Sequence, residues 1–181
     1  MVKNISVIIP SFNEEENIKE LYERIVKVLD EININDYEII FIENGSSDSS
    51  FNILKNINAL NNKVKIVSFS RNFGYQNAIL AGLEYSKKDH ACILDGDLQD
   101  PPEIIKDFIL KADDGFDVVY GVRKKREATF FKKISYKLFY FVYQKLSEIS
   151  VPKEVGEFCL INRKVINHLI KLREKNLFIR G

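Results

Sequence analysis

The chain has 181 residues, of which 45% are apolar and 29% charged, and its formal net charge is +1 at pH 7. This length fits a single domain with a core large enough to fold alone, and the composition is that of a soluble globular protein. A net charge so close to zero argues against a dedicated nucleic-acid-binding protein.

Apolar runs and helical patterns alternate along the first two thirds of the chain. Short continuous apolar runs predict buried strands at residues 5–9, 38–42, 64–69, 91–94 and 117–122, the first of them stopped by Pro10. Apolar residues at helical spacing predict helices at residues 18–29, 51–57, 75–85 and 102–112. The helix at 75–85 contains Ala78, Ala81 and Gly82, so we expect it to pack closely on the sheet.

This alternation predicts an α/β fold of three layers, with helices on both faces of a mostly parallel, Rossmann-like sheet. In open sheets of this kind, ligands bind beyond the carboxyl ends of the strands. Polar side chains follow the predicted strand ends at Asn13, Glu43, Asn44, Asp48, Arg71, Asp95, Asp97, Gln99 and Arg123. The topology alone is therefore expected to bring these side chains together in one site.

Three oxygen donors follow the fourth predicted strand at alternate positions, Asp95, Asp97 and Gln99. In an extended chain, residues two apart point to the same side, so the three would converge just beyond the strand. Gly96 between them allows an unusual backbone conformation or the close approach of a ligand. Hard oxygen donors suit Mg²⁺ or Mn²⁺, ions that one or two carboxylates hold together with waters and substrate phosphates.

The alternative is an acidic loop without a ligand. Asp100, which precedes two prolines, is explained as the cap of the next helix. That explanation does not extend to Asp95 and Asp97, because two carboxylates so close together repel each other unless a cation lies between them. A metal–diphosphate site is the interpretation that accounts for both.

Other strand-end residues each have two interpretations. Arg123 has a fork of donors that suits phosphates, but it also begins a basic run. Glu43 and Asn44 suit the edge of a base or ribose, or ordinary turn chemistry before a helix. Arg71 would pair with a ligand or with an internal carboxylate. Since the chain contains no P-loop, no G-x-G-x-x-G and no G-x-S-x-G, a diphosphate held by a metal at the strand ends indicates a nucleotide-sugar.

Several segments together resemble a known family. They are IIPSFNEEENI, ENGSSDSS, SRNFGYQNAILAGL, DGDLQDPPE and YGVRKKRE. They resemble the inverting glycosyltransferases of family 2, which have the GT-A fold. Within that family, the chain is similar to the polyprenyl-phosphate glycosyltransferases of the dolichyl-phosphate mannosyltransferase type.

The resemblance implies roles for individual residues. Asp95, Asp97 and Gln99 would hold the metal and the donor diphosphate, and Arg123 would contact phosphate. Glu157, in a segment where the family has Gly-Asp-Phe-Arg, would be the acceptor-side carboxylate, so the implied catalytic residues are Asp97, Glu157 and Arg123. The nucleotide would lie against loops that contain Pro10, Phe12, Asn13, Glu14, Glu43, Asn44, Asp48 and Arg71. The chain departs from the family at Glu43-Asn44, where Asp-Asp is usual, and at Cys159, where arginine is usual.

Residues 123–145 are basic and aromatic. They are compatible with a helix in a membrane interface, with a helix packed on the domain, or with a nucleic-acid patch, and the resemblance favours the membrane interface. We expect one domain over residues 1–181, with a nucleotide-sugar-binding half at 1–122 and an acceptor- and membrane-facing half at 123–181. No signal peptide or membrane-spanning run is expected in this chain, and C-terminal transmembrane helices of the family would lie beyond it.

The resemblance therefore implies an inverting transfer of sugar from a UDP- or GDP-sugar to a polyprenyl phosphate, supported by Mg²⁺ or Mn²⁺. The expected partners are the nucleotide-sugar, the lipid phosphate and a membrane surface at its cytoplasmic face, with a homo-oligomer left open and no nucleic acid. One alternative is a family 2 enzyme that acts on a sugar hydroxyl during surface polysaccharide synthesis. Another is a nucleotide-sugar-binding module without catalysis.

Overall fold

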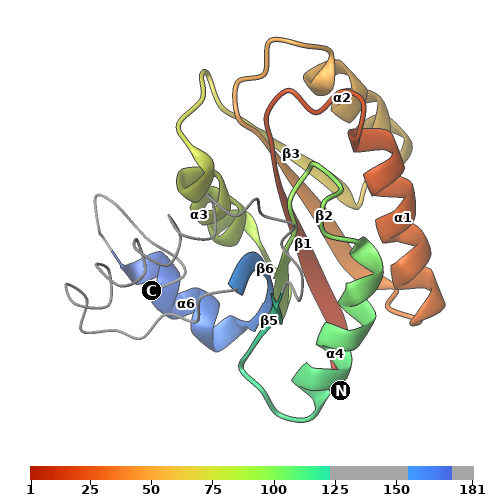
Figure 1. Ribbon diagram of the computed structural model, residues 1–181, viewed down its shortest axis with the longest axis vertical. Helices are drawn as coiled ribbons and strands as arrows, with labels where there is room; N and C mark the ends of the chain where they lie inside the picture. The colour runs from red at the N-terminus through yellow and green to blue at the C-terminus, as the bar shows by residue number, and fades with distance from the viewer. Residues whose placement is uncertain (123–154, 173–181) are drawn as a thin grey trace, which may run out of the picture.

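A six-stranded sheet runs through the computed structural model, which describes residues 1–122 and 155–172 (Figure 1). The strands, in the order β3-β2-β1-β4-β6-β5, are β1 (Asn4–Ser11), β2 (Asp36–Glu43), β3 (Val64–Ser68), β4 (His90–Ile93), β5 (Val118–Val122) and β6 (Val155–Asn162). The helices are α1 (Ile18–Glu31), α2 (Ser50–Leu60), α3 (Tyr75–Tyr85), α4 (Ile105–Asp113), which follows the short 3₁₀ helix η1 (Pro102–Ile104), and α6 (Arg163–Lys171).

Strands β1 to β4 pair in parallel, which confirms the predicted mostly parallel sheet. The sequence did not predict β6, which is antiparallel to β4 and separates it from β5. Since β5 is in turn antiparallel to β6, it runs in the same direction as the first four strands. The insertion of β6 brings the amino end of that strand to the edge where the other strands have their carboxyl ends.

Two local predictions need correction. Strand β1 does not stop at Pro10 but continues to Ser11, which pairs with the end of β2. The missing N–H of Pro10 is tolerated there because it falls on the side of β4, which has already ended at Ile93. At η1 the capping position is Pro101, without a side-chain cap, so Asp100 lies one residue before the cap.

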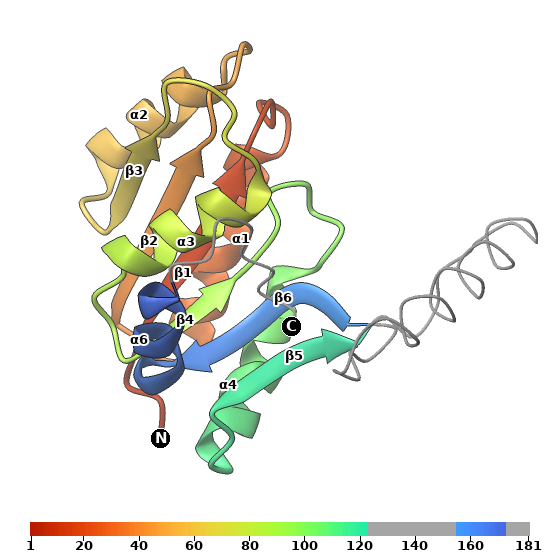
Figure 2. The same cartoon turned by 90° about the vertical axis from the view of Figure 1, so that its left-hand side faces the viewer.

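The core lies on both faces of the sheet. Apolar side chains of one face pack against α1, α2 and α4, and those of the other face pack against α3 and α6 (Figures 1 and 2). In β1 the alternation is direct, because Val7 and Ile9 face the first set of helices and Ile8 faces the second. This is the predicted three-layer α/β arrangement.

Helix α3 lies unusually close to the sheet, as its small residues predicted. A Cβ on Gly82 would come within 2.2 Å of Ile8 Cγ2, so the position has room for glycine alone. Ala78 and Ile79, one turn earlier, are fully buried against the same face. This close packing therefore fixes the position of α3, including its first residues, relative to the carboxyl edge of the sheet.

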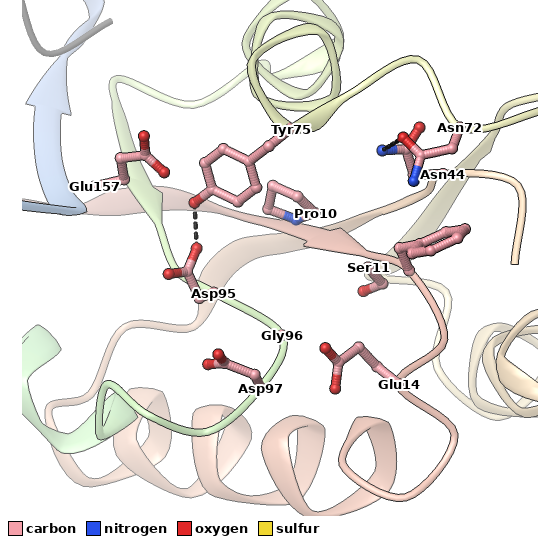
Figure 3. A pocket seen from close by; sticks show the side chains of 11 residues that line it. Pro10, Ser11, Glu14, Asn44, Asn72, Tyr75, Asp95, Gly96, Asp97 and Glu157 are labelled. Carbon is pink, nitrogen blue, oxygen red and sulfur yellow. Dashed lines mark hydrogen bonds between the residues drawn. The ribbon is translucent and has the colours of Figure 1, made fainter.

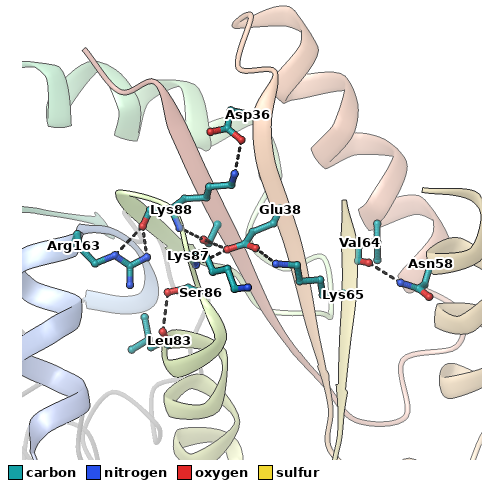
Figure 4. Close-up of polar contacts among 11 residues, drawn as sticks. Asp36, Glu38, Asn58, Val64, Lys65, Leu83, Ser86, Lys87, Lys88 and Arg163 are labelled. Atoms are coloured by element: carbon teal, nitrogen blue, oxygen red, sulfur yellow. Dashed lines mark hydrogen bonds and ion pairs between the residues drawn. The ribbon is translucent and has the colours of Figure 1, made fainter. Parts of the chain in front are cut away.

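The opposite, amino edge of the sheet is closed by a polar network around Glu38 (Figure 4). Glu38 is only 2% exposed, and its carboxylate accepts hydrogen bonds from Ser6 Oγ at 2.6 Å and from the Lys87 backbone N–H at 2.6 Å. It also forms an ion pair with Lys65 on β3. Burial alone would raise the pKa of Glu38, but the bonds from Lys65, Ser6 and Lys87 outweigh it and hold the pKa below the ordinary 4.5.

We expect Glu38→Gln to destabilise the domain by about 2 kcal/mol near neutral pH, because a charge-assisted network loses its charge while Lys65 keeps its own. Since the folded pKa of Glu38 is lowered, this stabilisation is present above pH 4.5 and is lost as the pH falls through the folded pKa. Urea unfolding across the acid range should therefore show that the difference between wild type and variant shrinks at low pH. The control is Glu23→Gln, at a carboxylate 63% exposed and 4.0 Å from Lys19. An equal loss of stability in both variants, or a constant difference at all pH values, would contradict the assignment.

Candidate functional site

A pocket of about 430 Å³ opens at the carboxyl edge of the sheet (Figure 3). It is built from the ends of β1 and β2, the loop before α3 and the first residue of that helix, the acidic turn after β4, and the start of β6. The lining residues are Pro10, Ser11, Phe12, Glu14, Asn44, Asn72, Tyr75, Asp95, Gly96, Asp97 and Glu157. The predicted convergence of strand ends is thus present, and it includes Pro10, Phe12, Glu14, Asn44, Asp95, Asp97 and Glu157 from the predicted set.

The acidic turn places two of its three predicted donors in the pocket. Asp95 and Asp97 line the pocket, whereas Gln99 is exposed and lies outside the lining. The strand ends at Ile93, and Leu98 has a left-handed φ of 60°, so residues 95–99 form a turn rather than the extended segment assumed for alternate positions. The donor set to be weighed for a metal is therefore Asp95 and Asp97.

Gly96 is needed for the close approach of this turn to the end of β1. A Cβ at Gly96 would lie 3.1 Å from the Pro10 carbonyl oxygen, tighter than ordinary contact. The Asp97 carboxylate accepts a hydrogen bond from the Gln99 backbone N–H at 3.0 Å, which fixes the turn. Asp97 and Glu14 face the pocket from opposite sides (Figure 3).

Asp95 is partly buried, and its Oδ1 accepts a hydrogen bond from the hydroxyl of Tyr75. Burial raises the pKa of Asp95, and the nearby charges of Asp97 and Glu157 raise it further against the lowering effect of the tyrosine bond. Burial, Asp95 and Glu157 likewise raise the pKa of Tyr75, so the phenol keeps its proton and remains a donor. The pocket therefore concentrates negative charge and would favour a cation.

The hydroxyl of Ser11 is an unusual feature of this pocket. Ser11 is 1% exposed, and its Oγ has no hydrogen-bond partner within residues 1–122 and 155–172. A buried polar group left unsatisfied costs about 1–3 kcal/mol, so such an atom in a pocket indicates contact with a polar ligand. Sequence reasoning missed Ser11, because its significance depends on the lack of a protein partner.

The loop after β2 and the loop before α3, which both line the pocket, are joined by hydrogen bonds. Asn44 Oδ1 accepts from the Phe73 backbone N–H at 2.9 Å, and Asn44 Nδ2 donates to Asn72 Oδ1 at 3.3 Å. Gly45, at φ 75°, lies so close to the Arg71 backbone that a Cβ would come within 2.5 Å of its carbonyl carbon. Asn72, which the sequence did not single out, joins Asn44 in the lining.

Four predicted nucleotide contacts lie outside the pocket lining. Glu43 is buried and accepts from Ser68 Oγ at 3.1 Å and from the backbone N–H of Ser46. Asn13 accepts from the Ser47 backbone N–H at 2.9 Å, and Asp48 accepts from the Ser50 backbone N–H at 2.9 Å. The Arg71 guanidinium lies 4.7 Å from the centre of the Phe73 ring. Glu43, Asn13 and Asp48 hold the loops that shape the pocket, because their acceptors are used by backbone and hydroxyl groups of those loops.

Glu157 reaches the pocket because of an irregularity in β6. The β5–β6 register passes from Tyr120 opposite Cys159 to Val122 opposite Val155, so three residues of β6 face Gly121 alone. Glu157 is the middle residue of this bulge, and bulges commonly redirect a side chain next to an active site. Its Oε1 accepts a hydrogen bond from Gln76 Nε2 at 2.9 Å.

The remaining predicted residues are not described. Arg123 and the basic aromatic segment 123–145 lie outside the described residues. Among the helices of residues 1–122 and 155–172, none is long and apolar enough to cross a bilayer.

The residues present fit a divalent ion shared with a bound diphosphate. In the part of the chain that the structure describes, no cluster of three or more acidic, histidine or cysteine side chains is placed to hold a metal. Mg²⁺ is usually bound by one or two carboxylates together with substrate phosphates and waters, which is what Asp95 and Asp97 offer. The unpartnered Ser11 hydroxyl close to the same turn adds a polar group for such a ligand.

The sheet order and the helices on both faces are those of the GT-A fold, with the acidic pocket at the carboxyl edge of the sheet. One similar solved structure is the mannosyltransferase PcManGT from Pyrobaculum calidifontis in complex with GDP-Man and Mn²⁺. The match has a TM-score of 0.61 at 17% sequence identity, and it covers 91% of this chain and 46% of the PcManGT chain. That likeness supports the fold alone. The chain belongs to glycosyl transferase family 2, whose model matches residues 6–170.

Relatives in the family extend well beyond this chain. The uncharacterized glycosyltransferase YkcC of Bacillus subtilis (strain 168) is 44% identical over 177 residues, which are 97% of this chain and 54% of the relative. The bactoprenol glucosyl transferase of Shigella phage SfV is 36% identical over 178 residues, 98% of this chain and 58% of the relative. The chain therefore spans little more than half the length of these relatives.

Proposed function

We propose that this domain transfers a sugar from a UDP- or GDP-sugar to a polyprenyl phosphate, with inversion at the anomeric carbon and with Mg²⁺ or Mn²⁺. The observation that carries the proposal is the pairing of carboxylates in one pocket, with Asp95 and Asp97 on the turn after β4 and Glu157 on β6. The likeness to a protein named for glucosyl transfer to bactoprenol supports the lipid phosphate as acceptor.

Each side of the pocket has a separate task in this proposal. A divalent ion held by Asp95 and Asp97 would neutralise the donor diphosphate and stabilise its charge as it leaves. Asn44, Asn72 and Phe12 line the part of the pocket left for the nucleoside. Glu157, on the other side of Tyr75, would position the acceptor phosphate or the sugar.

The proposed reaction is a single displacement. An oxygen of the acceptor phosphate forms a bond to the anomeric carbon, while the bond from that carbon to the diphosphate breaks and its electron pair leaves with the nucleoside diphosphate. A phosphate monoester has a second pKa of about 6 and is largely ionised at neutral pH, so the acceptor needs little help from a base. Because the acceptor is a lipid, we place the reaction at the cytoplasmic face of a membrane, with residues 123–145 as the predicted contact.

The donor can be identified by thermal shift with UDP, GDP and their sugars, each with and without Mn²⁺. With Mn²⁺, the correct nucleoside diphosphate should stabilise the protein by about 2.7 kcal/mol at a concentration 100 times its Kd, and the same concentration should stabilise it clearly less without the metal. The matched nucleoside monophosphate, which lacks the second phosphate, is the control and should show little metal dependence. Metal-dependent stabilisation by none of the diphosphates would contradict the donor site.

The acceptor is then tested by product analysis with the identified nucleotide-sugar. Mass spectrometry should show that a polyprenyl phosphate receives sugar much faster than a hydroxyl of an oligosaccharide does. Transfer to the oligosaccharide alone would instead establish a family 2 enzyme that acts on a sugar hydroxyl. Donor binding without transfer or hydrolysis would indicate a binding module.

A further inference from the structure

The first residue of α3 makes a contact that the proposed reaction does not by itself explain. Tyr75 projects its phenol into the pocket, and its hydroxyl donates to Asp95 Oδ1 (Figure 3). Within the described residues, Oδ2 of the same carboxylate receives no hydrogen bond. One oxygen of Asp95 is thus occupied by a protein donor, and the other is left for a ligand.

The phenol is carried on a rigid support. Gly74, at φ 90°, is the residue before α3, and its backbone N–H donates to Asn72 Oδ1 at 2.8 Å. Further along α3, Gly82 lies directly on Ile8 of β1. The helix that carries Tyr75 is therefore fixed both at its start and on the sheet.

The neighbouring carboxylate has a donor of its own. Gln76, the next residue of α3, donates to Glu157 Oε1 at 2.9 Å. Two successive residues of one helix therefore each donate to one of the carboxylates that face this pocket. The Tyr75 hydroxyl is near both carboxylates, since besides burial both Asp95 and Glu157 raise the pKa of Tyr75, and it donates its hydrogen bond to Asp95.

We propose that Tyr75 is a positioning residue, which fixes the Asp95 carboxylate so that its second oxygen binds the divalent ion of the donor site. This inference rests on the proposed function, since it assumes that Asp95 shares a metal with the donor diphosphate. Outer partners that orient a metal-binding carboxylate typically contribute 10- to 100-fold to metal affinity. Tyr75 acts through Asp95 and contacts neither substrate nor metal in this role.

The test is the affinity for the nucleoside diphosphate that the thermal-shift screen identifies, measured by calorimetry with and without Mn²⁺. Tyr75→Phe removes only the hydroxyl and should weaken Mn²⁺-supported binding about 10- to 100-fold. The affinity measured without the metal and the melting temperature should both stay unchanged. If Tyr75 had a merely structural role, its loss would lower these two quantities as well. The control is Tyr85→Phe at the end of the same helix, where the side chain is 59% exposed.

A double-mutant cycle tests whether the effect passes through Asp95. In an Asp95→Asn background, Tyr75→Phe should have little further effect on Mn²⁺-supported binding, because the orienting bond acts on the carboxylate already removed. Unchanged metal-supported affinity in Tyr75→Phe, an equal loss with and without metal, or full additivity with Asp95→Asn would each overturn this role. Wild-type protein without any metal-dependent nucleotide binding would instead overturn the proposed function, and this role with it.

Discussion

Asp97→Asn is expected to lower the rate of sugar transfer about a thousandfold or more and to remove metal-dependent donor binding. The change keeps the size of the side chain and one oxygen that can accept from the Gln99 backbone N–H, now 3.0 Å away. It removes the charge that, with Asp95, would hold the cation. The loss should therefore appear in the chemistry and in metal-supported binding, while the fold is kept.

The control for this prediction is Asp107→Asn, at an exposed carboxylate on α4. Both variants should unfold at the same temperature as the wild type, and only Asp97→Asn should lose activity. A rate for Asp97→Asn within a few fold of wild type would show that the carboxylate does not take part in catalysis. The donor site would then have to be sought outside the acidic turn.

The sequence predicted the parallel half of the sheet well, because β1, β2 and β4 are buried on both faces and therefore appear as continuous apolar runs. It did not predict β6, whose central residues include Glu157 and whose place between β4 and β5 depends on pairing with strands far away in the chain. The resemblance to family 2 selected Glu157, but only the antiparallel strand and its bulge explain how that carboxylate reaches the pocket.

Some polar residues of the site could likewise be located from the sequence, and others could not. Strand ends could be located from the apolar pattern, so Asp95 and Asn44 were correctly placed in one pocket. Gln99 lies outside the pocket lining because the left-handed conformation at Leu98, a residue without a turn signature, redirects the chain. Ser11 was missed because its significance lies in a bond that the protein does not make, which no local pattern encodes.

Glu157→Gln should distinguish the two kinds of acceptor, because they differ in their need for a base. A sugar hydroxyl has a pKa far above 7, and loss of a general base typically costs about 10²- to 10⁴-fold in rate. A phosphate monoester is already ionised, since its second pKa is about 6, so its transfer should fall no more than about tenfold. The substituted amide still offers an oxygen to Gln76 Nε2, so the geometry of the pocket should be preserved.

The comparison of acceptors makes this prediction sharper than a single loss of activity, because damage to the fold or to donor binding would lower both rates together. Rates with a polyprenyl phosphate and with a sugar hydroxyl should be measured on the same preparations of Glu157→Gln and of the control Glu84→Gln, an exposed carboxylate on α3. A small loss with the lipid phosphate supports Glu157 as a residue that positions the acceptor. An equal, severe loss with both acceptors would refute that role, because ionisation of the phosphate would then have no influence on the step that Glu157 assists.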